Sequence, residues 1–197
     1  MKVYDISQEL ISCKVFPGDP PPRLECVSDM KLGALYNLSN LSMCVHNGTH
    51  VDAQAHFYAD GKRIGQLGLE KCIGPCYVYT KDGVLSKTDA LNVIEEAKKI
   101  DDECYLRLLF RGNTTVSEEA AEEFAKARVY LVGNESQTVG PEDAPMKVHH
   151  ILLKEEVVLL EGIRLSHVKD GRYILNAAPL NIANAEGAPC RAVLLEM

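Results

Sequence analysis

The chain has 197 residues, a formal net charge of -7 and 46% hydrophobic residues. This length fits one domain, residues 1–197, with a core of its own. The acidic balance argues against nucleic acid or an anionic membrane surface as the main partner. No apolar run approaches the roughly 18 residues that cross a bilayer, and no basic-then-apolar leader opens the chain, so we expect a cytoplasmic protein without membrane contact.

Hydrophobic patterning predicts more strands than helices. In chain order the expected elements are strands 3–6, 23–27, 41–45 and 72–80, a helix from the N-cap Ser86 to about Lys99, strand 104–110, a helix opening at 116–119, strand 129–132, a helix at 147–154, and strands 157–160, 173–177 and 191–195. Residues 15–22 are expected to form a rigid loop, because proline removes the donors of a sheet ladder. Two strand-helix-strand units in the middle predict a mixed α/β or α+β domain around one central β core.

The densest chemical feature lies between His46 and His56. This stretch holds three of the chain's six histidines together with Asp52. Imidazole and carboxylate are ligands that suit zinc, manganese and iron. Gly48 favours a turn between His46 and His50, because glycine permits backbone angles that other residues avoid. The cluster follows the predicted strand 41–45, so we expect it on a loop that this strand fixes, and we expect it to bind a divalent metal.

A second ion would need ligands from elsewhere in the chain. Asp52 can bridge two ions through its two carboxylate oxygens, and the other candidates are His149, His150, His167 and acidic residues at strand ends. Glu161 follows a predicted buried strand, where a carboxylate is costly unless it is paired or bound to a metal. Adjacent histidines such as 149 and 150 are also typical of a polar surface, so the residues alone leave their role open.

The seven cysteines form an odd set, which predicts free thiols in a reducing compartment. Cys72 and Cys76 are four residues apart, unlike a Cys-x-x-Cys pair, and we expect buried packing rather than a structural metal site. Cys44 flanks the histidine cluster and could lie close behind the ligands. Its place in the predicted strand 41–45 favours core packing instead.

The run His46-Asn47-Gly48-Thr49-His50-Val51-Asp52-Ala53-Gln54-Ala55-His56-Phe57 resembles the signature of the cyclase-like metal-dependent hydrolases, a family that includes bacterial kynurenine formamidases and isatin hydrolases. Further segments resemble the family's motifs in the same order and spacing. They are residues 4–7, 16–20, 133–138, 149–153 with 161–162, 178–180 and 187–192.

The resemblance implies roles for individual residues. It implies that His46, His50 and Asp52 bind one metal, and that Asp52, His149 and Glu161 bind a second, with Asp52 or Glu161 shared. It implies that His56 is the catalytic acid/base beside the ions and does not bind them. The cofactor would be two divalent ions per chain, zinc or manganese. The fold would be a barrel-like or swivelling β/β/α core flanked by helices, in a homodimer or tetramer.

The implied chemistry is hydrolysis of an amide C–N bond. The ions would lower the pKa of a water molecule and polarise the carbonyl. His56, with an ordinary pKa near ~6.5, could accept the proton and return it to the leaving nitrogen. The Thr49 hydroxyl is a candidate hydrogen-bond donor behind the ligands.

Two positions depart from the family pattern and bear on the substrate. Gln54 stands where the family commonly has proline, which should relax the backbone and add a polar side chain near His56. Phe16 stands where kynurenine formamidases have a tryptophan that packs on the aromatic substrate. A phenylalanine can still stack, so Phe16 remains a candidate substrate-binding residue and no implied ligand is missing.

The first functional hypothesis is therefore an arylformamidase that converts N-formylkynurenine to kynurenine in tryptophan catabolism. Within the same enzyme class, the alternative is hydrolysis of an isatin-type lactam or another cyclic amide. A different class is a non-catalytic metal- or ligand-binding protein on the same fold, which would have no need of His56. In a purely structural interpretation the histidines only make hydrogen bonds. The residues specify neither the native metal nor the physiological substrate.

Overall fold

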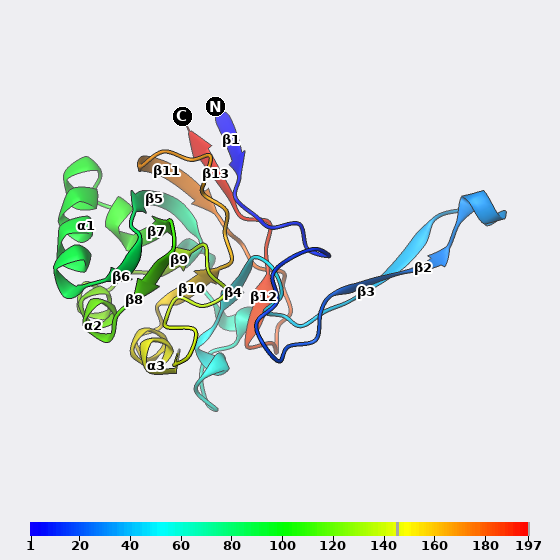
Figure 1. Cartoon of the computed structure of the whole chain (residues 1–197), viewed down its shortest axis with the longest axis horizontal. Helices are drawn as coiled ribbons and strands as arrows, with labels where there is room; N and C mark the ends of the chain where they lie inside the picture. The colour runs from blue at the N-terminus through cyan, green and yellow to red at the C-terminus, as the bar shows by residue number, and fades with distance from the viewer. Residues whose placement is uncertain (145, 197) are drawn as a thin grey trace.

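The computed structural model describes residues 1–144 and 146–196. Within them, nine strands form one curled sheet in the order β1-β13-β11-β5-β7-β9-β10-β4-β12 (Figure 1). The strands of this sheet are β1 (Lys2–Asp5), β4 (His50–Asp52), β5 (Ile73–Thr80), β7 (Arg107–Arg111), β9 (Leu131–Asn134), β10 (Val158–Glu161), β11 (Gly171–Asn176), β12 (Gly187–Pro189) and β13 (Val193–Glu196). The two chain ends meet at one edge, where β1 pairs with β13. The expected mixed α/β fold with one central β core is confirmed.

Three helices cover one face of the sheet: α1 (Lys87–Ile100), α2 (Glu118–Lys126) and α3 (Met146–Lys154) (Figure 1). They connect the parallel central strands β5, β7, β9 and β10, because parallel neighbours need a crossover connection. Phe110 and Phe124 are fully buried in the core between this face and the helices. A second core, with Leu109 and Leu160, lies on the other face of the sheet, because side chains alternate along a strand.

The predicted helix starts are confirmed by their capping contacts. The Ser86 hydroxyl accepts from the Asp89 backbone N–H at 3.2 Å, and the Asp89 carboxylate accepts from the Ser86 N–H at 2.9 Å. Ser117 caps α2 in the same way by accepting from the Ala120 N–H at 3.1 Å. Such caps satisfy backbone donors that have no partner inside the helix. The short parallel pair β6 (Gly83–Leu85) and β8 (Thr114–Val116), which the sequence did not predict, lies next to these starts.

A two-stranded arm projects away from the body of the molecule (Figure 1). It consists of β2 (Arg23–Ser28), the 3-10 turn Met30–Leu32 and β3 (Leu38–Ser42). Every residue of β3 is exposed. The prediction of a core strand at 41–45 is wrong, because the strand ends at Ser42 and pairs only within the arm.

Cys44 consequently does not pack in the core. It is half-buried, and its Sγ lies 3.9 Å from Asp19 Oδ2. All seven cysteines are free, as predicted, and Cys72, Cys76 and Cys104 are buried.

Two further expectations change at the sheet. The second half of the histidine cluster is not a loop: His50–Asp52 form β4, which pairs antiparallel with both β10 and β12. The segment 104–110 opens with a 3-10 turn, Cys104–Leu106, before β7 begins at Arg107. No helix in the described part of the chain has the length and apolar character that a bilayer crossing requires.

Candidate metal centre and active site

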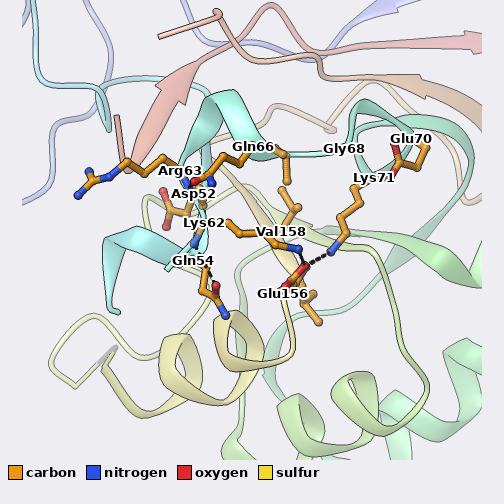
Figure 2. Close-up of a pocket in the computed structure, with 13 residues that line it drawn as sticks. Asp52, Gln54, Lys62, Arg63, Gln66, Gly68, Glu70, Lys71, Glu156 and Val158 are labelled. Carbon is orange, nitrogen blue, oxygen red and sulfur yellow. Dashed lines mark hydrogen bonds and ion pairs between the residues drawn. The ribbon is translucent and has the colours of Figure 1, made fainter. Parts of the chain in front are cut away.

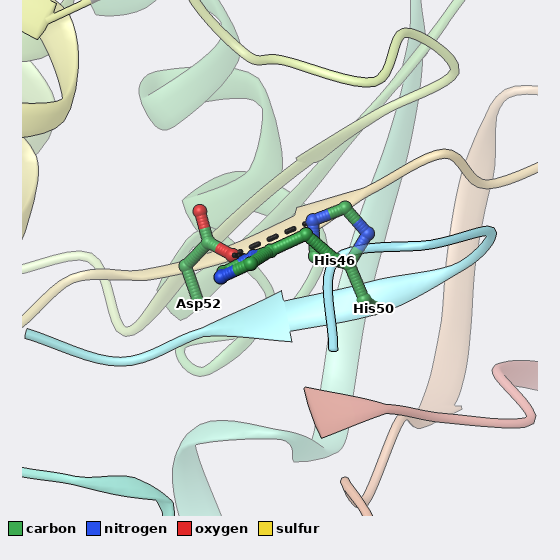
Figure 3. A group of neighbouring side chains, drawn as sticks. All are labelled: His46, His50 and Asp52. Atoms are coloured by element: carbon green, nitrogen blue, oxygen red, sulfur yellow. Dashed lines mark hydrogen bonds and ion pairs between the residues drawn. The ribbon is translucent and has the colours of Figure 1, made fainter. Parts of the chain in front are cut away.

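The first group of candidate ligands comes from β4 and the turn before it. His50 and Asp52 are two residues apart on the strand, so their side chains share one face. His46 reaches them from the preceding turn, and its Nδ1 lies 2.9 Å from Asp52 Oδ1. His50 Nε2 lies 3.4 Å from the same oxygen. Figure 3 shows the three side chains gathered along the strand.

The second group adds residues from helix α3 and strand β10. His149 Nε2 lies 3.2 Å from Glu161 Oε1 and 3.8 Å from Asp52 Oδ2. In each group, one ligand atom per residue lies within 4.8 Å of the others. Asp52 belongs to both groups, and its two oxygens face different partners. The structure thus brings together the five residues predicted from the sequence, across a gap of about a hundred residues.

Local hydrogen bonds orient these side chains. His50 Nδ1 lies 3.1 Å from the Gly48 carbonyl, which leaves Nε2 facing the carboxylates. The Val139 N–H donates to Glu161 Oε1 at 2.8 Å. The Thr49 hydroxyl donates to the Gly162 carbonyl at 2.8 Å and so ties the start of β4 to the end of β10.

The charges in the cluster shift one another's pKa values. Burial lowers the pKa of His46, but the adjacent Asp52 carboxylate outweighs burial and raises that pKa to about 9. Burial also opposes the charged form of His50, yet the carboxylates of Glu161 and Asp52 raise its pKa. Burial raises the pKa of both carboxyl groups, but the surrounding histidines lower the pKa of Asp52 and of Glu161 overall.

The residues fit a divalent cation. His46 Nε2 and Asp52 Oδ2 are buried, and neither has a hydrogen-bond partner among the described residues. Buried polar atoms without partners are costly, whereas a cation would satisfy both. Nitrogen and carboxylate oxygen are the ligand types that suit zinc and manganese.

A cavity of about 270 Å³ opens above the cluster. Its walls are formed by Phe16, Asp19, His46, His50, His56, Phe57, Gln137, Thr138, His149 and Glu161. The His56 ring lies 4.1 Å from the His46 ring and 6.2 Å from the His149 ring, centroid to centroid. Burial and the neighbouring imidazoles of His46 and His149 lower the pKa of His56, although the Asp52 carboxylate acts in the opposite direction. The lowered pKa favours the neutral form of His56.

Four wall residues had no assigned role in the sequence analysis: Asp19, Phe57, Gln137 and Thr138. Each lies in a segment that resembles a family motif, and this resemblance is the sequence feature by which they could have been found. Phe57 stacks on the His149 ring at 4.8 Å. Helix α3 turns His149 inward and leaves its neighbour His150 exposed. Of the two adjacent histidines, only His149 therefore joins the cluster.

Gln54 lies away from this cavity. Its Oε1 accepts from the Lys62 N–H at 3.0 Å and its Nε2 donates to the Lys154 carbonyl at 3.4 Å. It borders a separate cavity of about 300 Å³ behind β4, where the Glu156 carboxylate pairs with Lys62 and Lys71 (Figure 2). The structure therefore links Gln54 to the end of α3 and not to the substrate side of His56.

These residues could hold a divalent metal ion, and known metal-dependent hydrolases share the fold. The family model described as "Putative cyclase" matches residues 4–141. A kynurenine formamidase of Erythrobacter litoralis is 32% identical over 212 residues, which cover 100% of this chain and 94% of that protein.

Solved structures agree with this likeness. A "predicted metal-dependent hydrolase" of Bacillus stearothermophilus is 25% identical with a TM-score of 0.81, covering 98% of this chain and 97% of its own. Isatin hydrolase A of Ralstonia solanacearum shares the fold, with a TM-score of 0.81 at 20% identity over 99% and 92% of the two chains. The chain belongs to the cyclase family.

Proposed function

We propose that this chain is a metal-dependent hydrolase that cleaves the amide bond of aryl formamides, with N-formylkynurenine as the first candidate substrate. The observation that carries the proposal is the position of His56. It shares the cavity with both ligand groups, yet it belongs to neither of them. A protein that only stored or bound a metal would have no use for this additional imidazole.

We assign His46, His50 and Asp52 to one ion, and Asp52, His149 and Glu161 to a second. The support is that both groups are compact, that every member except the half-buried His46 is buried, and that the groups share Asp52. Zinc and manganese are the candidate ions, because the ligands are imidazoles and carboxylates. A divalent ion held there would supply a Lewis acid for the carbonyl and lower the pKa of a water molecule.

The chain's own residues perform the proton transfers. His56 accepts a proton from the attacking water at its free ring nitrogen and delivers it to the leaving aryl nitrogen, so that formate and the aryl amine are released. Phe16 and Phe57 offer aromatic faces on the cavity wall for the aryl group. Thr49 keeps β4 and the end of β10 in register, and with them the ligands that each strand carries.

The substrate is tested by assaying the zinc- and manganese-loaded protein on N-formylkynurenine and on isatin. Faster turnover of N-formylkynurenine supports the proposal, which the likeness to kynurenine formamidase favours. Faster turnover of isatin would favour lactam hydrolysis on the same machinery. If the metal-loaded protein turns over neither compound, the substrate assignment fails.

We also propose a homo-oligomer. The arm exposes large apolar side chains, including Leu32 at 86%, Leu35 at 92% and Tyr36 at 59%. An isolated two-stranded hairpin is marginally stable in water, and exposed apolar patches of this kind usually mark protein contacts. A second copy of the chain is the partner that the family resemblance implies. The free cysteines favour a reducing compartment, so we propose a cytoplasmic location.

A further inference from the structure

The loop that carries Phe16 is a tight turn with a defined geometry. The Asp19 N–H donates to the Phe16 carbonyl at 3.1 Å, which closes a four-residue turn with Pro17 and Gly18 at its centre. Gly18 has φ of 100°, and a turn with proline second and a positive-φ glycine third is of type II. The turn therefore places Phe16 and Asp19 side by side, and both line the active-site cavity.

The charge of the cavity wall is one-sided. Among the described residues, no lysine or arginine lines the cavity, whereas Asp19 does. Asp19 is half-buried, and its carboxylate makes no ion pair within the described chain. Its Oδ2 lies 3.9 Å from Cys44 Sγ. Glu186 adds a further carboxylate near the site, with Oε1 at 3.5 Å from His46 Nε2.

We propose that Asp19 determines substrate specificity by pairing with a positively charged group on the substrate. The inference rests on the proposed function and extends it. The preferred class is an aryl formamide whose ring stacks on Phe16 while an ammonium group on its side chain reaches Asp19. A charge-assisted pair of this kind is stronger than a neutral hydrogen bond. Away from the metal ligands, a substrate carboxylate finds no lysine or arginine on this wall, whereas it would face Asp19, and it is disfavoured there.

Four related formanilides separate the contributions of charge. N-formylkynuramine carries the ammonium alone, N-formylkynurenine carries both charges, 2-formamidobenzoylpropionate carries the carboxylate alone, and 2-formamidoacetophenone carries neither. In the metal-loaded wild type we expect kcat/KM to be about tenfold or more higher for N-formylkynuramine than for the neutral compound, and lowest for the compound with the carboxylate alone.

Variants at position 19 test the assignment directly. In Asp19→Asn, we expect the ratio of kcat/KM between N-formylkynuramine and the neutral compound to fall at least about tenfold. In Asp19→Lys, the preference should reverse toward the carboxylate-bearing compound. Asp60→Asn is the matched control, because Asp60 is exposed and lines none of the cavities described above. A ratio that stays at the wild-type value in both Asp19 variants would overturn the proposal.

A binding measurement keeps this test separate from the test of catalysis. The affinities of kynuramine and of 2-aminoacetophenone, the amine products, are measured by calorimetry on wild type and Asp19→Asn. If kynuramine binds more tightly than 2-aminoacetophenone to wild type but not to Asp19→Asn, the ammonium site is supported. If in addition no formanilide is hydrolysed, the proposed function fails while the ammonium site stands. Hydrolysis of all four compounds at equal kcat/KM, with equal product affinities, would refute the ammonium site alone.

Discussion

His50 and Glu161 are direct partners across the ladder between the antiparallel strands β4 and β10. Their side chains meet on one face of the sheet, with His50 Nε2 at 3.5 Å from Glu161 Oε2. Asp52, two residues along β4, projects from that same face. Three of the five candidate ligands are thus held by backbone hydrogen bonds of a sheet, which is a rigid support for a metal centre.

The role of His56 predicts a separation between metal binding and turnover. In His56→Ala, we expect the metal content to stay at the wild-type level while kcat falls by about 10²–10⁴-fold, the usual contribution of a positioned acid/base. Metal content by elemental analysis and kcat on N-formylkynurenine are measured together. His167→Ala is the control, because His167 is exposed and lies outside the cavity. Full activity of His56→Ala would rule out the assigned role.

Gly187 on β12 predicts a second effect on the metal centre. A Cβ at this position would lie 2.5 Å from His46 Cε1, so Gly187→Ala must displace the imidazole. We expect metal affinity at the His46 group to fall by about 10–100-fold, as when a supporting residue of a metal site is lost. Competition with a chelator measures the affinity. In a His46→Ala background, Gly187→Ala should lower the metal affinity little further. If it lowers the affinity of that variant as much as that of wild type, Gly187→Ala does not act through His46.

The raised pKa of His46 predicts a pH dependence of the stability of the metal-free protein. Because the folded value is about 9 and the ordinary value is 6.5, the His46–Asp52 pair contributes its full stability below about pH 6.5. That contribution is lost as pH rises through about 9. Chemical unfolding of metal-free wild type and His46→Gln should therefore give a difference in free energy that shrinks between pH 6.5 and 9.5. A constant difference would contradict the pairing.

The exposed arm predicts that the protein associates with itself. We expect wild type to have a mass in solution that is a multiple of the 21.7 kDa of one chain. Replacing Leu32 and Leu35 by serine should shift it toward a single chain, because these side chains would lose their apolar contact. Leu91→Ser on α1, which is 43% exposed, is the control. Light scattering after size-exclusion chromatography reads the mass, and a monomeric wild type would end the proposal.

The sequence predicted which residues come together better than it predicted their surroundings. His46, His50 and Asp52 are close in the chain, so their meeting is a local matter, and the burial of Glu161 followed from the apolar strand before it. The arm was misread because Leu24 and Leu41 fit the pattern of a core strand, and strand patterning does not say which face finds a partner. The Gln54 side chain points toward the Lys154 carbonyl because of the way α3 packs, and this packing cannot be predicted from the spacing of residues in the sequence.

The central claim is that hydrolysis depends on a divalent metal held by the five candidate ligands, His46, His50, Asp52, His149 and Glu161. The most direct measurement is the rate of N-formylkynurenine hydrolysis after removal of metal by a chelator, and again after addition of zinc or manganese. We expect the metal-free protein to be inactive and its activity to return when about two ions per chain are bound. Asp52→Asn lacks the carboxylate common to both groups, so we expect it to recover neither the bound ions nor the activity. Full activity of the metal-free protein would contradict the account.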